Sequence, residues 1–227
     1  LKEEGCWLHY NDDISELPEV FLEKKSTVVI YTPAVSDLHK ELTYFKESGY
    51  RVLKRAEVLG DVTQFSKGLC VAGTHGKTTT STLLAHILNQ SSWKCNAFLG
   101  GISSNYDSNY IYDDKSDYTV IEADEYDRSF LKLKPFSSII TSVDPDHLDV
   151  YSGKNDFFNG FQDYARLIDE SGVCVVKYGI GLSSNARMIT YSIEDKEADY
   201  YGYDLHVVNA RFYMKVLFPD KRVEILE

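Results

Sequence analysis

The sequence has few cysteines and no long apolar run, and each shortage excludes a class of protein. No stretch approaches the roughly 20 consecutive apolar residues that a transmembrane helix needs, so we expect no membrane span and no membrane partner. The four cysteines form no C-x-x-C pair, which excludes zinc-finger and thioredoxin-type sites. Cys70 and Cys174 lie within apolar, strand-like runs, so we expect buried, inert thiols. This cysteine usage favours a reducing compartment, and we expect a cytoplasmic protein.

Positive charge is also scarce. The chain has 24 Lys and Arg against 35 Asp and Glu, which gives a formal net charge of −11. An acidic surface repels nucleic-acid backbones, so we expect no nucleic-acid partner, although this balance is compatible with a local basic site for phosphates. Hydrophobic residues make up 43% of the chain and charged residues 26%, which are ordinary globular values that exclude disorder of the whole chain.

Strand-like and helix-like patterns alternate along the chain. Near-continuous apolar strands that are joined through helices predict an α/β fold with a parallel sheet covered by helices on both faces. A change of pattern at residues 66–68 predicts two domains, 1–66 and 67–227. Residues 100–116, which are rich in Gly, Asn, Ser and Asp, are expected to be mostly loop, and antiparallel strands are expected at 200–203 and 212–218. Other strands are predicted at 27–31, 50–53, 69–72, 118–121, 138–143 and 173–176, and helices at 37–48, 56–66 and 156–170.

The strongest motif is a glycine-rich turn at residues 73–79, which follows an apolar strand and precedes a helix. Backbone N–H groups of such a turn, together with the helix N-terminus, form an anion cradle. A full Walker pattern would have glycine at position 71, where this chain has Val71, so the motif is the shorter G-T-x-G-K-T-T form. We expect Lys77 to contact the β- and γ-phosphates of a nucleotide and Thr78 to bind Mg²⁺. The predicted phosphate-binding residues are Gly73, Thr74, His75, Gly76, Lys77, Thr78 and Thr79.

Carboxylates follow two of the predicted strands at the point where each strand ends. Glu122 follows residues 118–121, and the segment D-P-D-H-L-D, which contains Asp144, Asp146, His147 and Asp149, follows residues 138–143. The carboxyl ends of parallel strands meet at one rim of a sheet, which is where ligands bind. Mg²⁺ prefers hard oxygen ligands, so Glu122 is a candidate metal ligand beside the glycine-rich turn. Solvated loop carboxylates are the alternative.

Three motifs together resemble those of the Mur ligases of bacterial peptidoglycan synthesis. They are A-G-T-H-G-K-T-T-T at 72–80, E-A-D-E-Y-D-R-S-F at 122–130 and T-S-V-D-P-D-H-L-D-V-Y at 141–151. The motifs occur in order, and the resemblance covers essentially the whole chain. It implies that residues 1–66 are part of a Rossmann-like domain that binds a UDP-sugar. It also implies that residues 67–227 are a central ATP-binding domain with a P-loop-type parallel sheet flanked by helices.

The resemblance further implies a reaction, in which UDP-N-acetylmuramate and L-alanine are joined at the expense of ATP through an acyl phosphate. It implies that Mg²⁺ held by Thr78 and Glu122 acts with Lys77 on the β- and γ-phosphates, and that His147 helps to hold a second Mg²⁺. The catalytic residues implied are therefore Lys77, Glu122 and His147, and the metal ligands are Thr78, Glu122 and His147.

Other functions remain open at this point. A ligase that recycles muramyl tripeptides shares the E-A-D-E-Y-D segment, and a P-loop ATPase or nucleotide switch without ligase activity would need the same turn. A non-catalytic binding module fits less well with an intact Lys77 and Thr78. The glycine-rich opening turn and the C-terminal domain of the family are not found in these residues, so we expect an internal piece of a longer ligase.

Overall fold

A computed structural model describes residues 2, 5–32, 34–146 and 150–227. It divides the chain into two compact units, Leu1–Leu59 and Gly60–Glu227, within helix α2 (Arg55–Phe65). The division precedes the change of sequence pattern at 66–68 because the second half of α2 packs against the larger unit. Thr63 Oγ1 accepts a hydrogen bond from the Lys134 backbone N–H at 3.0 Å. A Cβ at Gly60 would lie 2.3 Å from the carbonyl oxygen of Lys132.

The smaller unit contains a parallel pair of strands, β1 (Val28–Tyr31) and β2 (Arg51–Lys54), joined through helix α1 (Lys40–Glu47). Its buried residues include Leu42, Phe45 and Tyr50, and the rings of Phe45 and Tyr50 meet edge to face at 4.8 Å. The Tyr50 hydroxyl donates to the carbonyl of Leu22 at 2.7 Å, which ties the 3-10 helix η2 (Glu19–Leu22) to this core. Another 3-10 helix, η1, spans Ile14–Glu16.

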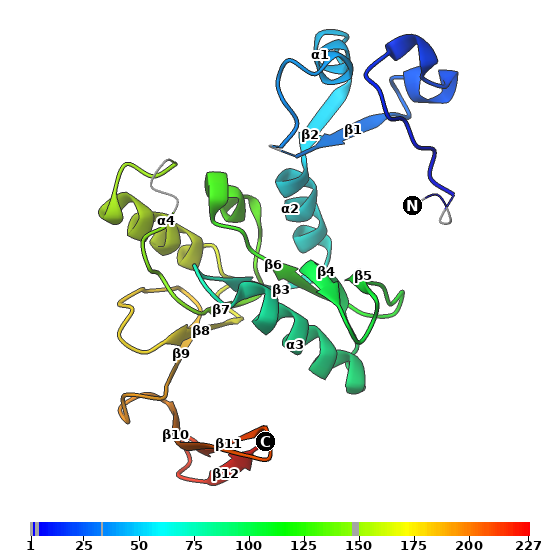
Figure 1. The fold of residues 1–227 in the computed structure, drawn as a ribbon. Coiled ribbons are helices and arrows are strands. Elements are labelled where there is room, and N and C mark those ends of the chain that lie inside the picture. The colour runs from blue at the N-terminus through cyan, green and yellow to red at the C-terminus, as the bar shows by residue number, and fades with distance from the viewer. Residues whose placement is uncertain (1, 3–4, 33, 147–149) are drawn as a thin grey trace. The chain divides into compact units, whose positions relative to one another are not determined.

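The larger unit is built on a mostly parallel sheet with the strand order β12-β11-β10-β9-β8-β7-β3-β6-β4-β5 (Figure 1). Strand β3 lies between β6 and β7 and is parallel to both, and the parallel region continues from β4 to β10. Antiparallel pairing is found at β4–β5 and across β10, β11 and β12. The predicted α/β fold is therefore confirmed. The strands are β3 (Lys67–Ala72), β4 (Asn96–Ser103), β5 (Ser108–Ile111), β6 (Tyr118–Glu122), β7 (Ser137–Ile140), β8 (Val173–Lys177), β9 (Arg187–Ser192), β10 (Tyr200–Val208), β11 (Arg211–Leu217) and β12 (Val223–Leu226).

Helices α3 (Lys77–Gln90) and α4 (Lys154–Arg166) flank the sheet. Ala85 of α3 is fully buried in a cluster with Val120 of β6. Helix α4 packs its aromatic face against Phe130 of the 3-10 helix η3 (Tyr126–Lys132), whose ring stacks on Tyr164 at 4.9 Å. The Tyr164 hydroxyl and Ser138 Oγ of β7 are 2.9 Å apart, so the same side chain also anchors α4 to the sheet.

Residues 104–107 and 112–116 are turn or irregular, as expected of this segment, but it also contains the end of β4, which runs to Ser103, and β5 at Ser108–Ile111. Two consecutive glycines, Gly100 and Gly101, disguise the end of β4, since glycine lowers strand propensity. A Cβ at Gly100 would lie 2.2 Å from Glu122 Oε2, so glycine here lets that carboxylate keep its observed position. The strand is held by pairing with β6 rather than by its local sequence.

Cys70 and Cys174 are buried in β3 and β8, as expected. Burial raises the pKa of the Cys70 thiol to about 12 and that of Cys174 to about 11, so both thiols stay protonated at neutral pH. Within the described residues, no helix is long and apolar enough to cross a bilayer.

Candidate active site

The glycine-rich turn connects β3 to α3 at the carboxyl edge of the sheet. Gly73 adopts φ +133°, and Gly76, which precedes the helix, adopts φ +78°. Residues with a side chain rarely adopt these backbone conformations, so glycine is needed at both positions. Gly73 also lies against β7's end, where a Cβ would sit 2.1 Å from Thr141 Oγ1 and 2.9 Å from the Ser142 nitrogen. The two glycines thus give this turn a shape that other residues would deform.

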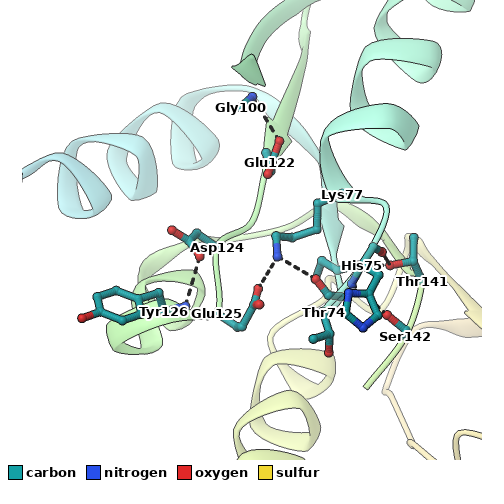
Figure 2. Close-up of polar contacts among 12 residues, drawn as sticks. Thr74, His75, Lys77, Gly100, Glu122, Asp124, Glu125, Tyr126, Thr141 and Ser142 are labelled. Atoms are coloured by element: carbon teal, nitrogen blue, oxygen red, sulfur yellow. Dashed lines mark hydrogen bonds and ion pairs between the residues drawn. The ribbon is translucent and has the colours of Figure 1, made fainter. Parts of the chain in front are cut away.

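Residues after β7 fix the turn from the side (Figure 2). The Thr74 N–H donates to the carbonyl of Ser142 at 3.2 Å, and the His75 N–H donates to Ser142 Oγ at 3.0 Å. Thr141 Oγ1 donates to the His75 carbonyl at 2.5 Å, and Thr74 Oγ1 donates to the Asp144 carbonyl at 2.8 Å. These bonds use the backbone and hydroxyl groups of the turn's outer part. They attach the turn to the segment that follows β7.

Helix α3 begins directly after Gly76, which has no side chain that could cap the first turn. The N–H groups of an uncapped first turn and the positive end of the helix dipole form an anion site. Thr78 and Thr79 present exposed side chains on this turn. The structure therefore brings residues 73–79 together in an arrangement that suits a polyphosphate.

Lys77 extends from the first turn of α3 back across the glycine-rich turn (Figure 2). Its Nζ donates to the Gly73 carbonyl at 2.8 Å and to Glu125 Oε2 at 2.7 Å. The Lys77 side chain is 14% exposed and that of Glu125 only 1%. This ion pair was not anticipated from the sequence. Glu125 lies in the E-A-D-E-Y-D-R-S-F motif, yet nothing in the residue pattern separates it from the other carboxylates of that motif.

Glu122 ends β6 and faces the same helix turn. Its Oε1 accepts from Thr78 Oγ1 at 3.1 Å, and its Oε2 accepts from the Gly100 N–H at 3.0 Å. Two of the three predicted metal ligands, Thr78 and Glu122, are therefore neighbours at the rim that carries the phosphate turn. A carboxylate and a hydroxyl are hard oxygen donors of the kind that Mg²⁺ takes, and Mg²⁺ completes its shell with water and phosphate oxygens. This donor pair fits that ion.

Of the two histidines of the predicted site, the structure describes only His75. His75 is held through its backbone, while its side chain is exposed, with Nε2 3.7 Å from Asp144 Oδ2. His147 lies outside the described residues, as does Asp149, so its predicted role stays a prediction. Among the residues that the structure does describe, no three His, Cys, Asp or Glu side chains gather as a metal site.

A cavity of about 330 Å³ opens beside Thr78, between the first turns of α3 and the end of β4. Hydroxyl and amide groups line it together with the apolar side chains of Leu83 and Ile102. His86 adds an imidazole, which lies within hydrogen-bond distance of Asn105 Nδ2 and the Tyr106 hydroxyl. The wall carries no Lys, Arg, Asp or Glu among the described residues, so it suits an uncharged polar group. Its lining residues are Thr78, Thr79, Thr82, Leu83, His86, Ile102, Ser103, Ser104 and Asn105.

Comparison with known sequences and structures decides the family. The profile of the Mur ligase middle domain matches residues 71–226, which include the turn, β6 and the whole sheet from β4 to β12. The chain belongs to the Mur ligase family. Its sequence is 49% identical over 231 residues to the UDP-N-acetylmuramate–L-alanine ligase of Porphyromonas gingivalis, and the match covers 100% of this chain and 51% of that relative.

Two solved Mur ligase structures share the fold. The UDP-N-acetylmuramate–alanine ligase of Thermotoga maritima matches with a TM-score of 0.75 and 26% identity, over 88% of this chain and 46% of that one. The UDP-N-acetylmuramate:L-alanyl-gamma-D-glutamyl-meso-diaminopimelate ligase of Neisseria meningitides matches with a TM-score of 0.76 and 19% identity, over 95% of this chain and 70% of that one. The chain spans about half the length of the curated relatives it matches.

Proposed function

We propose that this Mur ligase chain holds the ATP site and the phosphoryl-transfer machinery of an enzyme that joins L-alanine to UDP-N-acetylmuramate. One observation carries the proposal: Lys77 and the Thr78–Glu122 pair converge at the N-terminus of α3, at the carboxyl edge of a parallel sheet. The similarity in sequence to relatives with that named activity supports the choice of substrates.

The proposed reaction has two steps. A lactyl carboxylate oxygen of UDP-N-acetylmuramate attacks the γ-phosphorus of ATP, and ADP leaves. The amine of L-alanine then attacks the acyl carbon, and phosphate leaves with that carboxylate oxygen. Phosphoryl transfer depends on positioning and charge neutralisation. The turn at 73–79 would hold the phosphates, and Lys77 would neutralise them as negative charge shifts to the leaving group.

Mg²⁺ would supply a Lewis acid that offsets the negative charge of the phosphates. Thr78 and Glu122 are the described residues that would hold it, and we propose His147 as a ligand of a second Mg²⁺ on the basis of its motif. Gly100 donates its N–H to Glu122 Oε2 and so orients that carboxylate toward Thr78. The Glu122 carboxylate is thus fixed on both of its oxygens before any ion is bound.

The cavity beside Thr78 is the place we assign to the sugar of the carboxylate-bearing substrate. Its hydroxyl-rich wall offers hydrogen bonds to sugar hydroxyl and acetamido groups, and Leu83 and Ile102 offer apolar surface for a ring face. A substrate held there would lie next to the Thr78–Glu122 pair. We assign residues 67–227 to the central ATP-binding domain and residues 1–66 to part of the UDP-sugar-binding domain. A cytoplasmic location follows for an enzyme that uses ATP and UDP-sugars.

The ligase that recycles muramyl tripeptides is the second candidate, because it shares the E-A-D-E-Y-D segment that this chain has at residues 122–127. Product analysis separates the candidates. The natural chain that contains these residues is incubated with ATP, Mg²⁺, UDP-N-acetylmuramate and either L-alanine or the tripeptide, and the products are identified by mass spectrometry. We expect UDP-N-acetylmuramoyl-L-alanine and one ADP per amide. Amide formation with the tripeptide but not with L-alanine would establish the recycling activity instead, and ADP without any amide would establish an ATPase.

A further inference from the structure

We propose that Glu125 is a positioning residue for phosphoryl transfer: its buried carboxylate fixes the Lys77 ammonium at the mouth of the glycine-rich turn and offsets its charge until phosphates arrive. The inference rests on the proposed function, since it concerns the lysine that would meet the γ-phosphate. It concerns a different carboxylate from the one assigned to the metal.

The geometry places Glu125 directly against the lysine. Its Oε2 is 2.7 Å from Lys77 Nζ, while the Gly73 carbonyl accepts from the same nitrogen at 2.8 Å (Figure 2). A lysine ammonium has three N–H donors, and these two contacts employ two of them. Both acceptors are fixed by the fold, so the direction of the ammonium is fixed as well. A phosphate oxygen would thus meet a lysine that has already lost its side-chain freedom.

The backbone that carries Glu125 is itself held from outside the site. The Tyr151 hydroxyl donates to the Glu125 carbonyl at 2.6 Å, and Tyr151 is only 2% exposed. Burial raises the pKa of Tyr151 to about 12, so this donor keeps its proton at neutral pH. A second tie follows three residues later, where Arg128 Nη2 lies 2.7 Å from both carboxylate oxygens of Asp156 at the start of α4.

This segment is also strained. Asp127 and Arg128 adopt φ +51° and φ +55°, a left-handed backbone that residues with a side chain rarely adopt. The Arg128–Asp156 pair and the stacking of the guanidinium over the Tyr151 ring at 4.9 Å keep this conformation in place. Strain of this kind is found where the surrounding structure dictates a functional geometry. Here it follows closely after Glu125, whose carboxylate contacts Lys77.

Because Glu125 is charged, its removal should change ADP affinity and the reaction rate in opposite directions, which a purely structural role would not do. A buried carboxylate beside the lysine reduces the attraction that the site has for a polyphosphate, yet it aims the ammonium. We therefore expect Glu125→Gln, which keeps an acceptor of the same size, to bind ADP about five- to tenfold more tightly because one negative charge is removed. We expect the same variant to turn over about ten- to a hundredfold more slowly, because a neutral acceptor holds the ammonium less firmly.

The experiment combines calorimetric titration of ADP with steady-state kinetics of the natural chain that contains these residues. The matched control is Glu170→Gln, the same chemical change at an exposed glutamate past the far end of α4, and it should change neither quantity more than twofold. In a Lys77→Met background, Glu125→Gln should no longer change the rate, because its effect acts through the lysine. Thermal unfolding of each variant is followed in parallel.

Each outcome decides a different question. Failure of the parent protein to bind ADP would overturn the proposed nucleotide site as well as this inference. Binding by the parent with no change of affinity or rate in Glu125→Gln would overturn the positioning role alone. Weaker ADP binding together with a lower melting temperature would assign Glu125 to the core of the fold and would also overturn it. An undiminished effect in the Lys77→Met background would show that Glu125 acts on another group.

Discussion

Lys77→Met is expected to weaken nucleotide binding by about 1.5–3 kcal/mol, which is roughly ten- to a hundredfold, and to lower the rate of amide formation about 10²–10³-fold. Methionine keeps the unbranched stem but removes the charge that would meet the phosphates. The larger effect on rate follows because negative charge on the leaving phosphate is greater in the transition state than in bound ATP. Titration calorimetry with ADP and kinetics of ADP release measure the two quantities. Equal affinity for ADP in the variant and the parent would show that Lys77 does not contact the nucleotide.

A loss of function in Lys77→Met must be separated from a loss of fold. Glu125 is 1% exposed, and removing one partner of a buried ion pair typically costs about 3–5 kcal/mol of stability. The double variant Lys77→Met, Glu125→Gln removes both charges, so we expect it to regain most of the free energy of unfolding while it still binds nucleotide more weakly than the parent. Recovery of binding together with stability would mean that the lysine acts only through the fold.

Gly73→Ala is expected to abolish the shape of the phosphate turn. The residue's φ of +133° is strained for any side chain, at about 1–3 kcal/mol. The added Cβ would also lie 2.1 Å from Thr141 Oγ1 and 2.9 Å from the Ser142 nitrogen, and relief of such overpacking costs about 1–3 kcal/mol more. We expect the free energy of unfolding to fall by about 2–6 kcal/mol and ADP affinity to fall more than tenfold, because the carbonyl that holds Lys77 moves.

Gly179→Ala is the matched control for this variant. Gly179 has a φ of +87°, but a Cβ there would meet nothing within 4 Å. It therefore carries the cost of left-handed backbone, about 1–2 kcal/mol, without a clash and away from the turn. Chemical denaturation and ADP titration of both variants distinguish the cost of backbone strain, which both share, from that of the steric clash, which only Gly73→Ala has. If the two variants lost the same stability and both bound ADP normally, the close approach of Gly73 to β7 would have no functional meaning.

The sequence was most informative where a motif and a strand end coincide. Lys77, Thr78 and Glu122 could be placed together because a strand–turn–helix pattern and the end of the next parallel strand meet at one rim of the sheet. The structure brings Thr78 Oγ1 and Glu122 Oε1 to 3.1 Å, as that reasoning requires. The roles of these residues in binding ATP and metal stay predictions.

The features that the sequence did not predict depend on distant parts of the chain. Glu125 lies in a segment that accepts a hydrogen bond from Tyr151 at the Glu125 carbonyl and in which Asp127 and Arg128 adopt left-handed backbone. Neither feature leaves a local sequence pattern. The end of β4 was missed for a related reason. Its two glycines resemble a loop, but β6 supplies the pairing, and Gly100 is small because the Glu122 carboxylate lies against it. In each case tertiary contacts override the local preference.

The central claim is that these residues catalyse transfer of the γ-phosphoryl group to a substrate carboxylate. The most direct test follows an oxygen atom from UDP-N-acetylmuramate labelled with ¹⁸O in its lactyl carboxylate. The natural chain that contains these residues is given this substrate with ATP, Mg²⁺ and L-alanine, and the released phosphate is analysed by mass spectrometry. An acyl phosphate requires one ¹⁸O atom in each phosphate, because the carboxylate oxygen that attacks phosphorus leaves with it. Amide formation with unlabelled phosphate would contradict the proposed chemistry, and unlabelled phosphate without amide would mean that water, not the carboxylate, receives the phosphoryl group.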